Sequence, residues 1–260
     1  MDHSPVPPSS ENSPALLPDD HFGRNALNLL DRNYSAGTLV KALLYKARRR
    51  FLGPSRLILP SYRFGVLVFD REDLDGGGSD FGQDYIRALR EIGLTNSSRI
   101  FEFCAGPGYI GYSLLAHGLC RSLALADINP VAVQAARTTA EFNGLTGRVS
   151  IYQSDGLDQI PASEKWDLVV SNPPHFVEWE GNTKVRSEDL CWQLHKKFYS
   201  QVKLFLNPGG SVFMQENALG SSVDDFAPMI RESGGRIIQT LPGPDIGHGG
   251  KMYYILSRWD

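Results

Sequence analysis

The sequence lacks long apolar runs, a cysteine framework and a large excess of charge of either sign. No apolar stretch approaches the roughly 18 to 20 residues of a membrane-spanning helix, and the N-terminus has no secretory apolar region, so we expect a cytoplasmic protein with no membrane partner. The three cysteines are widely spaced and odd in number, which argues against disulfides and against a metal site. A formal net charge of -3 argues against the broad basic surface with which proteins bind long nucleic acids.

The sequence has 260 residues, of which 42% are hydrophobic, and this is enough for the core of one main domain with a small appended segment. Residues 1–19 are rich in proline and serine and predict a disordered tail. We expect an N-terminal helical and hairpin segment over residues 20–78 and the main domain over residues 79–260.

The N-terminal segment contains one amphipathic pattern and one hairpin pattern. The apolar residues of 36–52 recur at helical spacing, and the predicted helix ends with Arg48, Arg49 and Arg50. This basic end is either a solvated helix terminus or a contact to an anionic substrate or RNA. Residues 56–70 are apolar on both sides of proline, serine and glycine, which predicts a hairpin.

From Arg99 onward, short apolar strands alternate with helices, which predicts a parallel sheet covered on both faces. The expected strands are 99–104, 122–128, 149–155, 167–172, 211–217, 236–241 and 251–258, and the expected helices are 109–117, 130–144, 187–205 and 223–232. The last two strands are joined by a segment too short for a helical crossover, so they should be antiparallel. The expected fold is α/β, with a Rossmann-like seven-stranded sheet ending in an antiparallel pair.

A glycine loop follows the first strand of this sheet. Gly106 and Gly108 lie in "GPGYIG", a spacing that suits a dinucleotide, and the amides of the helix that follows should point toward the ligand. Glu102 precedes the loop, where a carboxylate would repel a pyrophosphate but suits the ammonium group of S-adenosylmethionine. The alternative is a Glu102 paired with a structural lysine or arginine. Asp127 ends the second strand, where it can bind the ribose of either cofactor.

Further residues complete the expected cofactor site. Asp155 ends the third strand, where it either accepts a hydrogen bond from the adenine amine or caps a helix. We also expect Ala105, Ile128, Gly156 and Asn172 to contact the cofactor, because they lie in or beside the same loops.

The segment "SNPPH" follows the fourth strand. Asn172 offers a carboxamide oxygen, and two prolines remove backbone donors, so the carbonyl of Pro173 can accept a hydrogen bond without a competing N–H group. Together they would hold the hydrogens of a planar nitrogen and turn its lone pair toward a methyl donor. His175 could stack on the planar group or transfer a proton. Alternatively, the prolines simply form a turn.

The segments 101–111, 126–144 and 167–175 resemble the D/N-P-P-Y/F/W branch of class I methyltransferases, in particular the release-factor glutamine methyltransferases and the small-domain group that modifies guanine in ribosomal RNA. The resemblance implies that Glu102, Gly106 and Gly108 form the cofactor loop, that Asp127 and Asp155 bind ribose and adenine, and that Asn172 with Pro173 binds the target nitrogen. Two positions depart from the family pattern. Cys104 replaces a glycine, and His175 replaces the usual aromatic residue.

We therefore expect S-adenosylmethionine-dependent N-methylation that releases S-adenosylhomocysteine. The acceptor expected first is a small-molecule amine or amide; the alternatives are a protein glutamine and a nucleobase in RNA or DNA. A nicotinamide-dependent oxidoreductase would leave Glu102 and "SNPPH" unexplained, and a catalytically silent binding module is the other rival. Two segments could close over the site: 76–89, with Phe81 or Gln83, and 176–192, with Trp179, Arg186 and Trp192. The alternative for these residues is ordinary loop packing.

Overall fold

The structure, a computed structural model, describes residues 59–63, 66–70, 74, 81–177, 188–247 and 250–259. The expectations for the tail (1–19), for the basic helix (36–52) and for Trp179 and Arg186 lie outside these residues. Those for the side chains of Phe81 and Gln83 do so as well. The boundary expected between residues 78 and 79 stays a prediction.

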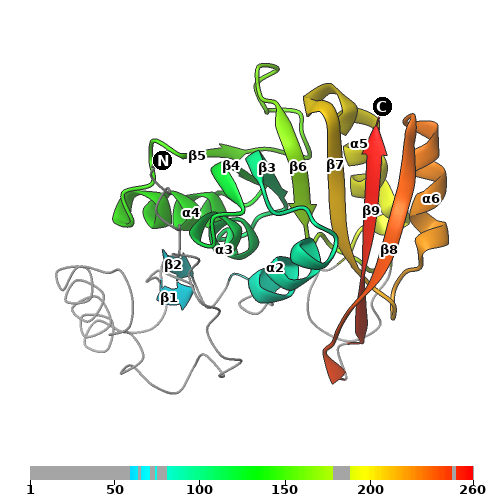
Figure 1. Cartoon of the computed structure of the whole chain (residues 1–260), viewed down its shortest axis with the longest axis horizontal. Coiled ribbons are helices and arrows are strands. Elements are labelled where there is room, and N and C mark those ends of the chain that lie inside the picture. Colours follow the sequence, from blue (N-terminus) through cyan, green and yellow to red (C-terminus); the bar gives the residue numbers. More distant parts are fainter. Residues whose placement is uncertain are drawn as a thin grey trace, which may run out of the picture.

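A seven-stranded sheet forms the centre of the described part, in the order β5-β4-β3-β6-β7-β9-β8 (Figure 1). Its strands are β3 (Ser97–Phe103), β4 (Cys120–Asp127), β5 (Val149–Gln153), β6 (Trp166–Ser171), β7 (Leu206–Asn217), β8 (Gly235–Asp245) and β9 (Lys251–Trp259). Neighbours from β5 to β7 are parallel, whereas β9 is antiparallel to both β7 and β8. The predicted α/β fold with an antiparallel C-terminal pair is confirmed.

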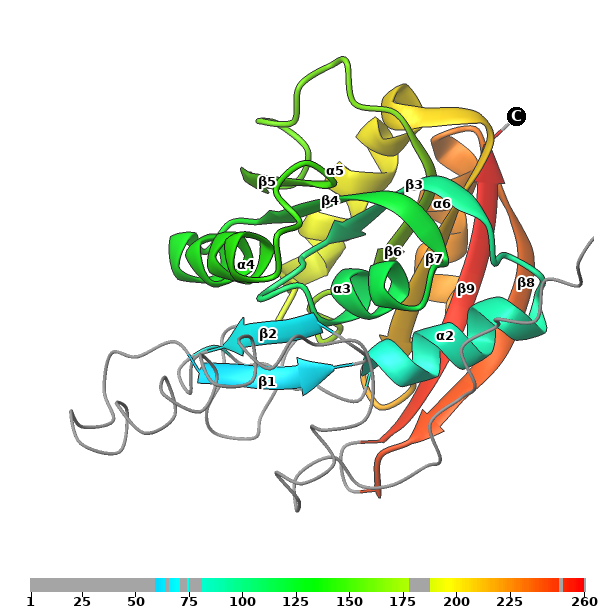
Figure 2. The same cartoon turned by 60° about the vertical axis from the view of Figure 1, so that its left-hand side comes forward.

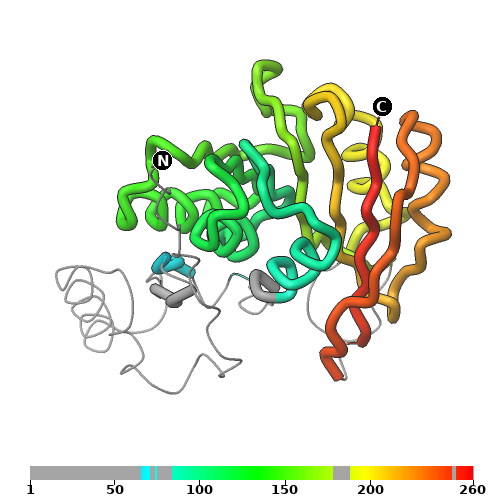
Figure 3. The backbone as a smooth tube through the Cα atoms, in the orientation of Figure 1, coloured from blue at the N-terminus to red at the C-terminus, as the bar shows by residue number. Residues whose placement is uncertain are grey.

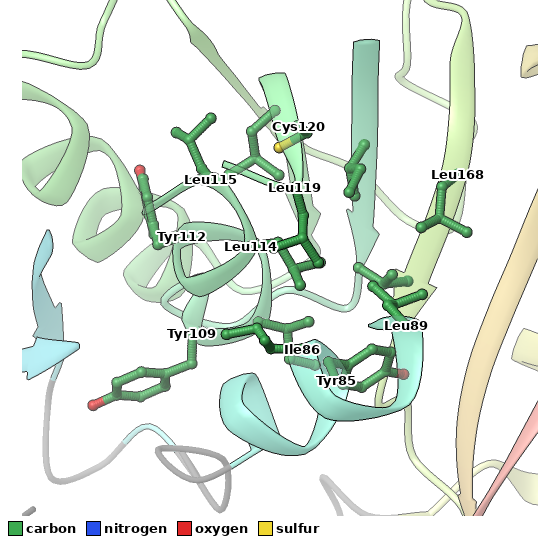
Figure 4. Close-up of a cluster of buried hydrophobic side chains, with 14 of the residues drawn as sticks. Tyr85, Ile86, Leu89, Tyr109, Tyr112, Leu114, Leu115, Leu119, Cys120 and Leu168 are labelled. Carbon is green, nitrogen blue, oxygen red and sulfur yellow. The ribbon is translucent and has the colours of Figure 1, made fainter. Parts of the chain in front are cut away.

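Helices cover both faces of this sheet (Figure 1). The first face carries α2 (Phe81–Glu91), α3 (Tyr109–Ala116) and α4 (Pro130–Phe142), and the second carries α5 (Gln193–Val202) and α6 (Val223–Glu232). Each face buries its own apolar cluster, because side chains on a strand point alternately to opposite sides. Figure 4 shows part of the first cluster, where Ile86 and Leu89 of α2 lie with Leu114 of α3 and Leu168 of β6.

The predicted hairpin is confirmed as β1 (Leu59–Arg63) paired with β2 (Val66–Asp70). It lies beside α3 and α4 (Figure 2). Asn143 pairs with β2 as a strand would, since its side chain accepts from the amide of Leu67 at 3.0 Å and donates to the carbonyl of Leu67 at 2.9 Å. The amide of Phe69 donates to Thr139 Oγ1 at 2.8 Å. The hairpin is therefore attached to α4, beside α3, on the first face of the sheet.

The predicted helix over 187–205 is shorter than expected. A 3₁₀ turn (Leu190–Trp192) precedes α5, and a second 3₁₀ turn (Lys203–Phe205) follows it. Cys191 and Trp192 have φ angles of 54° and 56°, left-handed values that an α-helix cannot continue through. From α5 onward, the chain passes through β7, α6, β8 and β9 to its C-terminus (Figure 3). Among the described helices, none is long and apolar enough to cross a membrane.

Candidate cofactor and acceptor site

The parallel strands end at one edge of the sheet and bring the predicted site loops together. β3, β4, β5 and β6 are neighbours in register, so the loops that follow their carboxyl ends start side by side. These loops contain the residues predicted for the cofactor and the acceptor. The prediction that they share one edge is confirmed.

The glycine loop after β3 combines an open position with a closed one. Gly106 and Gly108 have φ angles of 54° and 87°, which favour glycine. A Cβ added to Gly106 would meet no atom of the described residues within 4 Å, whereas one added to Gly108 would lie 2.8 Å from the ring of Tyr112. Gly108 is therefore required for packing, and Gly106 leaves its side of the loop open to a ligand. Ala105 is buried, and its amide donates to the carbonyl of Ala126 at 2.9 Å.

Cys104 begins this loop with a φ angle of 51°. A side chain in this left-handed conformation costs roughly 1–2 kcal/mol, which gives a physical reason why the family pattern has glycine here. Burial raises the pKa of the Cys104 thiol well above its usual value. The thiol therefore stays protonated and packs beside the second apolar cluster.

Asp127 connects the loops after β3 and β4. Its carboxylate accepts hydrogen bonds from the amide of Gly106 at 2.7 Å and from the amide of Asn129 at 2.8 Å. A carboxylate only accepts, so it suits the hydroxyl donors of a ribose. Ile128, the next residue, is 63% exposed. An exposed apolar side chain beside a carboxylate can cover one face of an adenine ring.

Glu102 has partners that the sequence did not suggest. It is 2% exposed, and its carboxylate accepts from the amides of Gly111 at 2.7 Å and Ile110 at 3.3 Å. The expectation that the first amides of α3 face the ligand is therefore wrong for these two. Within the described residues, no lysine or arginine pairs with Glu102. Burial raises the pKa of Glu102 to about 8, although the two amide hydrogen bonds act in the opposite direction.

Asp155 and Gly156 lie under a lysine from α5. Asp155 is exposed and pairs with Lys197 at 2.9 Å, and Lys197 also pairs with Asp158 at 2.8 Å. The stem of Lys197 crosses Gly156, where an added Cβ would lie 3.2 Å from it. Residues 155–160 form turns with no helix, so the alternative of Asp155 as a helix cap is wrong. Its contact with adenine stays a prediction.

Asn172 follows β6 with its carboxamide held from one side. Its Nδ2 donates to Oε1 of Gln215 at 3.1 Å, and Nε2 of Gln215 donates to the hydroxyl of Tyr254 at 2.7 Å. Because the donor end of the Asn172 carboxamide faces Gln215, its oxygen faces away from Gln215. This places an acceptor at the carboxyl edge, as a clamp for an N–H group requires.

His175 turns back onto its own motif. Its Nδ1 lies 3.0 Å from the carbonyl oxygen of Pro173. Since a carbonyl only accepts, Nδ1 carries the proton and Nε2 is left as an acceptor. The expectation of a Pro173 carbonyl without a competing donor is therefore wrong, although its second lone pair remains. Burial lowers the pKa of His175 to about 4, so the ring is neutral at neutral pH.

A buried charge network lies on the face of β7 opposite Gln215, and it was not predicted from the sequence. His195 is fully buried, with Nδ1 2.6 Å from Asp189 Oδ2 and Nε2 2.9 Å from Glu216 Oε1. The amide of Asp189 donates to the carbonyl of Phe176 at 2.7 Å, which ties this network to the segment after the N-P-P-H motif. The run of polar residues that ends "SVFMQEN" was the available signal.

Trp192 belongs to the same buried region. It is 8% exposed and contacts the rings of His195 and Phe226 edge-on at centroid distances of 5.4 Å and 4.9 Å. Of the two roles considered for Trp192, a lid over the acceptor and ordinary packing, the structure supports packing, because Trp192 lies in the second apolar cluster.

Known proteins with similar sequences include two groups of methyltransferases. The chain is 34% identical over 138 residues to a release factor glutamine methyltransferase of Clostridium acetobutylicum, a match that covers 48% of each protein. It is 41% identical over 111 residues to a ribosomal RNA small subunit methyltransferase C of Shewanella sp. (strain MR-4), which covers 42% of this chain and 31% of that protein. The chain thus spans about a third to a half of the length of these relatives.

Among solved structures, Trm5b from Pyrococcus abyssi superposes with a TM-score of 0.56 at 13% identity, over 79% of this chain and 57% of that one. This likeness supports the fold alone. The family described as Methyltransferase small domain matches residues 68–221, more than half of the sequence. A nicotinamide-dependent oxidoreductase is not supported. The chain belongs to the methyltransferase small domain family.

Proposed function

We propose that this enzyme transfers a methyl group from S-adenosylmethionine to a planar nitrogen of a macromolecule. The observation that carries this proposal is the carboxamide of Asn172, whose oxygen is turned away from Gln215 beside the glycine loop. A planar nitrogen is a poor nucleophile because its lone pair is delocalised. A pair of fixed acceptors supplies the orientation that such a nitrogen needs.

The residues present fit S-adenosylmethionine. Among the described residues, none would touch a Cβ added to Gly106, and backbone amides fix both oxygens of the Asp127 carboxylate. Ile128 supplies an exposed apolar surface beside them. We propose that these residues hold the methionine, ribose and adenine parts of the cofactor, with Ala105, Gly108, Asp155 and Gly156 beside them. When bound, the cofactor supplies an electrophilic methyl group on a sulfonium.

The hydrogen bonds of Glu102 indicate another role than the expected contact with the cofactor ammonium group. The buried carboxyl group is hydrogen bonded to the amides of Gly111 and Ile110, so we propose that it orders the start of α3 under the glycine loop. Gly111 is needed for this contact, because an added Cβ would lie 2.6 Å from Glu102 Oε2. A direct contact with the cofactor ammonium group would compete with these hydrogen bonds.

The acceptor nitrogen would be held by two oxygens. Asn172 Oδ1 accepts one hydrogen, and the second lone pair of the Pro173 carbonyl accepts the other. His175 stays neutral with a pKa of about 4, so it is a weak base at neutral pH and is better suited to lie against a planar group. The proton of the methylated nitrogen can leave to solvent, because N-methylation makes it strongly acidic.

Relatives favour a macromolecular acceptor. The two relatives named above carry names that refer to ribosomal RNA and to a release factor, so the small-molecule acceptor expected from the sequence is less well supported than its alternatives. We propose an exocyclic amine of RNA first, because the RNA relative has the higher identity. A protein glutamine amide is the second candidate.

Labelling with methyl-labelled S-adenosylmethionine tests this proposal. RNA, protein and small-molecule fractions are incubated separately with the enzyme, and the labelled fraction is hydrolysed to identify the methylated unit. We expect an N-methylated base, or N-methylglutamine for the second candidate. Asn172→Ala should remove at least nine-tenths of the label. Asn207→Ala is the matched control, because Asn207 bonds to Asp167 at the opposite edge of the sheet and should label normally. Label confined to small molecules would contradict the proposal.

A further inference from the structure

Gln215 is a buried amide with both ends occupied. It is fully buried on β7, with Oε1 3.1 Å from Nδ2 of Asn172 and Nε2 2.7 Å from the hydroxyl of Tyr254. Ser171 is the register partner of Met214, so Gln215 lies one residue further along the same strand pair, beside Asn172. Tyr254 is its register partner on β9. Gln215 thus joins the site residue to the antiparallel strand.

The partners of Gln215 are themselves fixed. The ring of Tyr254 stacks on Phe213 at a centroid distance of 4.8 Å and contacts Tyr85 edge-on at 5.2 Å. The hydroxyl of Tyr85 donates to the carbonyl of Ser171, the residue before Asn172, and lies 3.3 Å from the carbonyl of Phe213. The same aromatic cluster therefore holds the backbone before Asn172 and, through Gln215, its side chain.

The direction of the Asn172 carboxamide decides what the site offers. With Nδ2 on Gln215, Asn172 offers an oxygen to the acceptor; in the reversed orientation it would offer an NH2 group, which repels the hydrogens of an amine or amide. We propose that Gln215 is a positioning residue that fixes the Asn172 carboxamide with its oxygen toward the acceptor. This inference rests on the proposed function.

Two substitutions separate positioning from simple packing. Gln215→Glu places a carboxylate that can only accept, so it still accepts from Asn172 Nδ2, while the Tyr254 hydroxyl can donate to it. Gln215→Leu fills similar space but forms neither hydrogen bond. Positioning therefore predicts that Glu retains turnover within a few-fold, whereas Leu lowers kcat by 10-fold or more, each with unchanged affinity for S-adenosylhomocysteine. A packing role predicts the reverse order, because a buried charge destabilises and leucine does not.

The measurement combines kinetics with a readout of the carboxamide itself. Turnover is measured on the fraction that the wild type labels, for both Gln215 variants alone and for Gln215→Leu combined with Asn172→Ala. If Gln215 acts through Asn172, leucine costs nothing further in the Asn172→Ala background. In ¹⁵N spectra, the Asn172 side-chain NH2 signals, identified by their loss in Asn172→Ala, should exchange slowly with deuterium in the wild type and Gln215→Glu and rapidly in Gln215→Leu.

Each outcome decides the matter. Full turnover in Asn172→Ala would overturn the proposed function and the positioning role together. Two outcomes would overturn the positioning role alone when turnover is low in Asn172→Ala. One is normal turnover in Gln215→Leu, and the other is lower turnover in Gln215→Glu than in Gln215→Leu. If Gln215→Leu does not fold, Tyr254→Phe removes the acceptor of Gln215 Nε2, and it should speed exchange of the Asn172 NH2 hydrogens. Unchanged slow exchange there would also contradict the inference.

Discussion

The buried network of His195 predicts a specific loss of stability at alkaline pH. Asp189 and Glu216 lie against the two ring nitrogens, and ionised carboxylates only accept, so both nitrogens carry protons. Burial disfavours the charged ring, but Glu216 and Asp189 outweigh it and raise the pKa of His195 from 6.5 to about 9. Burial also raises the pKa of Glu216, and its Oε2 has no hydrogen-bond partner within the described residues.

The sign and the size of this stability loss follow from the pKa values of His195 in the unfolded and the folded protein. Because the folded pKa is above the unfolded one, the contribution is fully present below pH 6.5 and is lost as pH rises through 9. A rise from 6.5 to about 9 corresponds to about 3 kcal/mol of unfolding free energy, since one pKa unit is about 1.36 kcal/mol. The burial of Glu102 adds a loss in the same direction up to pH 8.

A paired variant removes the coupled His195 and Glu216 together and leaves the other titrating groups in place. His195→Gln with Glu216→Gln removes the titrating ring without leaving the Glu216 carboxylate buried alone, a situation that would cost roughly 3–5 kcal/mol. Urea unfolding is followed by tryptophan fluorescence at pH 6 and pH 9.5, with a reducing agent present. The wild type should lose about 3 kcal/mol more than the paired variant between these pH values. Parallel pH dependence in the two proteins would refute the charged network.

Three further outcomes test the site. Asp127→Ala should weaken S-adenosylhomocysteine binding by roughly 1.5–3 kcal/mol in calorimetry, and unchanged affinity with an intact fold would place the ribose elsewhere. At Cys104, the glycine variant should be more stable than the alanine variant by about 1 kcal/mol in thermal unfolding, because its φ angle is left-handed; the usual order, alanine above glycine, would contradict this strain. His175→Phe should keep activity, and the pH–rate profile of the wild type should show no limb from His175 between pH 5.5 and 9; a loss of 100-fold or more with normal cofactor binding would instead indicate a base.

The fold was predictable because its information is local. The strands from Arg99 to Asn172 are short apolar runs, and Asn129 and Pro130 mark the start of α4 as its cap and first residue. Parallel strands then require that the loops after them meet at one edge, so the strand pattern alone places Gly106 near Asp127. The 2.7 Å contact between the Gly106 amide and Asp127 agrees with that deduction.

The partners of the site residues were not predictable, because they depend on pairings between distant segments. Glu102 was expected to face a cofactor ammonium group, but the first turn of α3 comes close enough to take its carboxyl group. The protonation state of His175 could not be predicted from the sequence. Burial makes the ring neutral, and the Pro173 carbonyl fixes the proton on Nδ1. Gln215 was expected only as part of an apolar strand.

The antiparallel end of the sheet gains a functional meaning from these contacts. The motif after β6 lies next to the parallel neighbours β3 and β7, as it would in a sheet with only parallel strands. Here β9 runs against β7 and brings Tyr254 beside Gln215, which bonds to the Asn172 carboxamide. Tyr85 of α2 contacts Tyr254 and also bonds to the end of β6. The contacts that hold Asn172 thus come from β7, β9 and α2, so the orientation of its carboxamide depends on the antiparallel end of the sheet being folded.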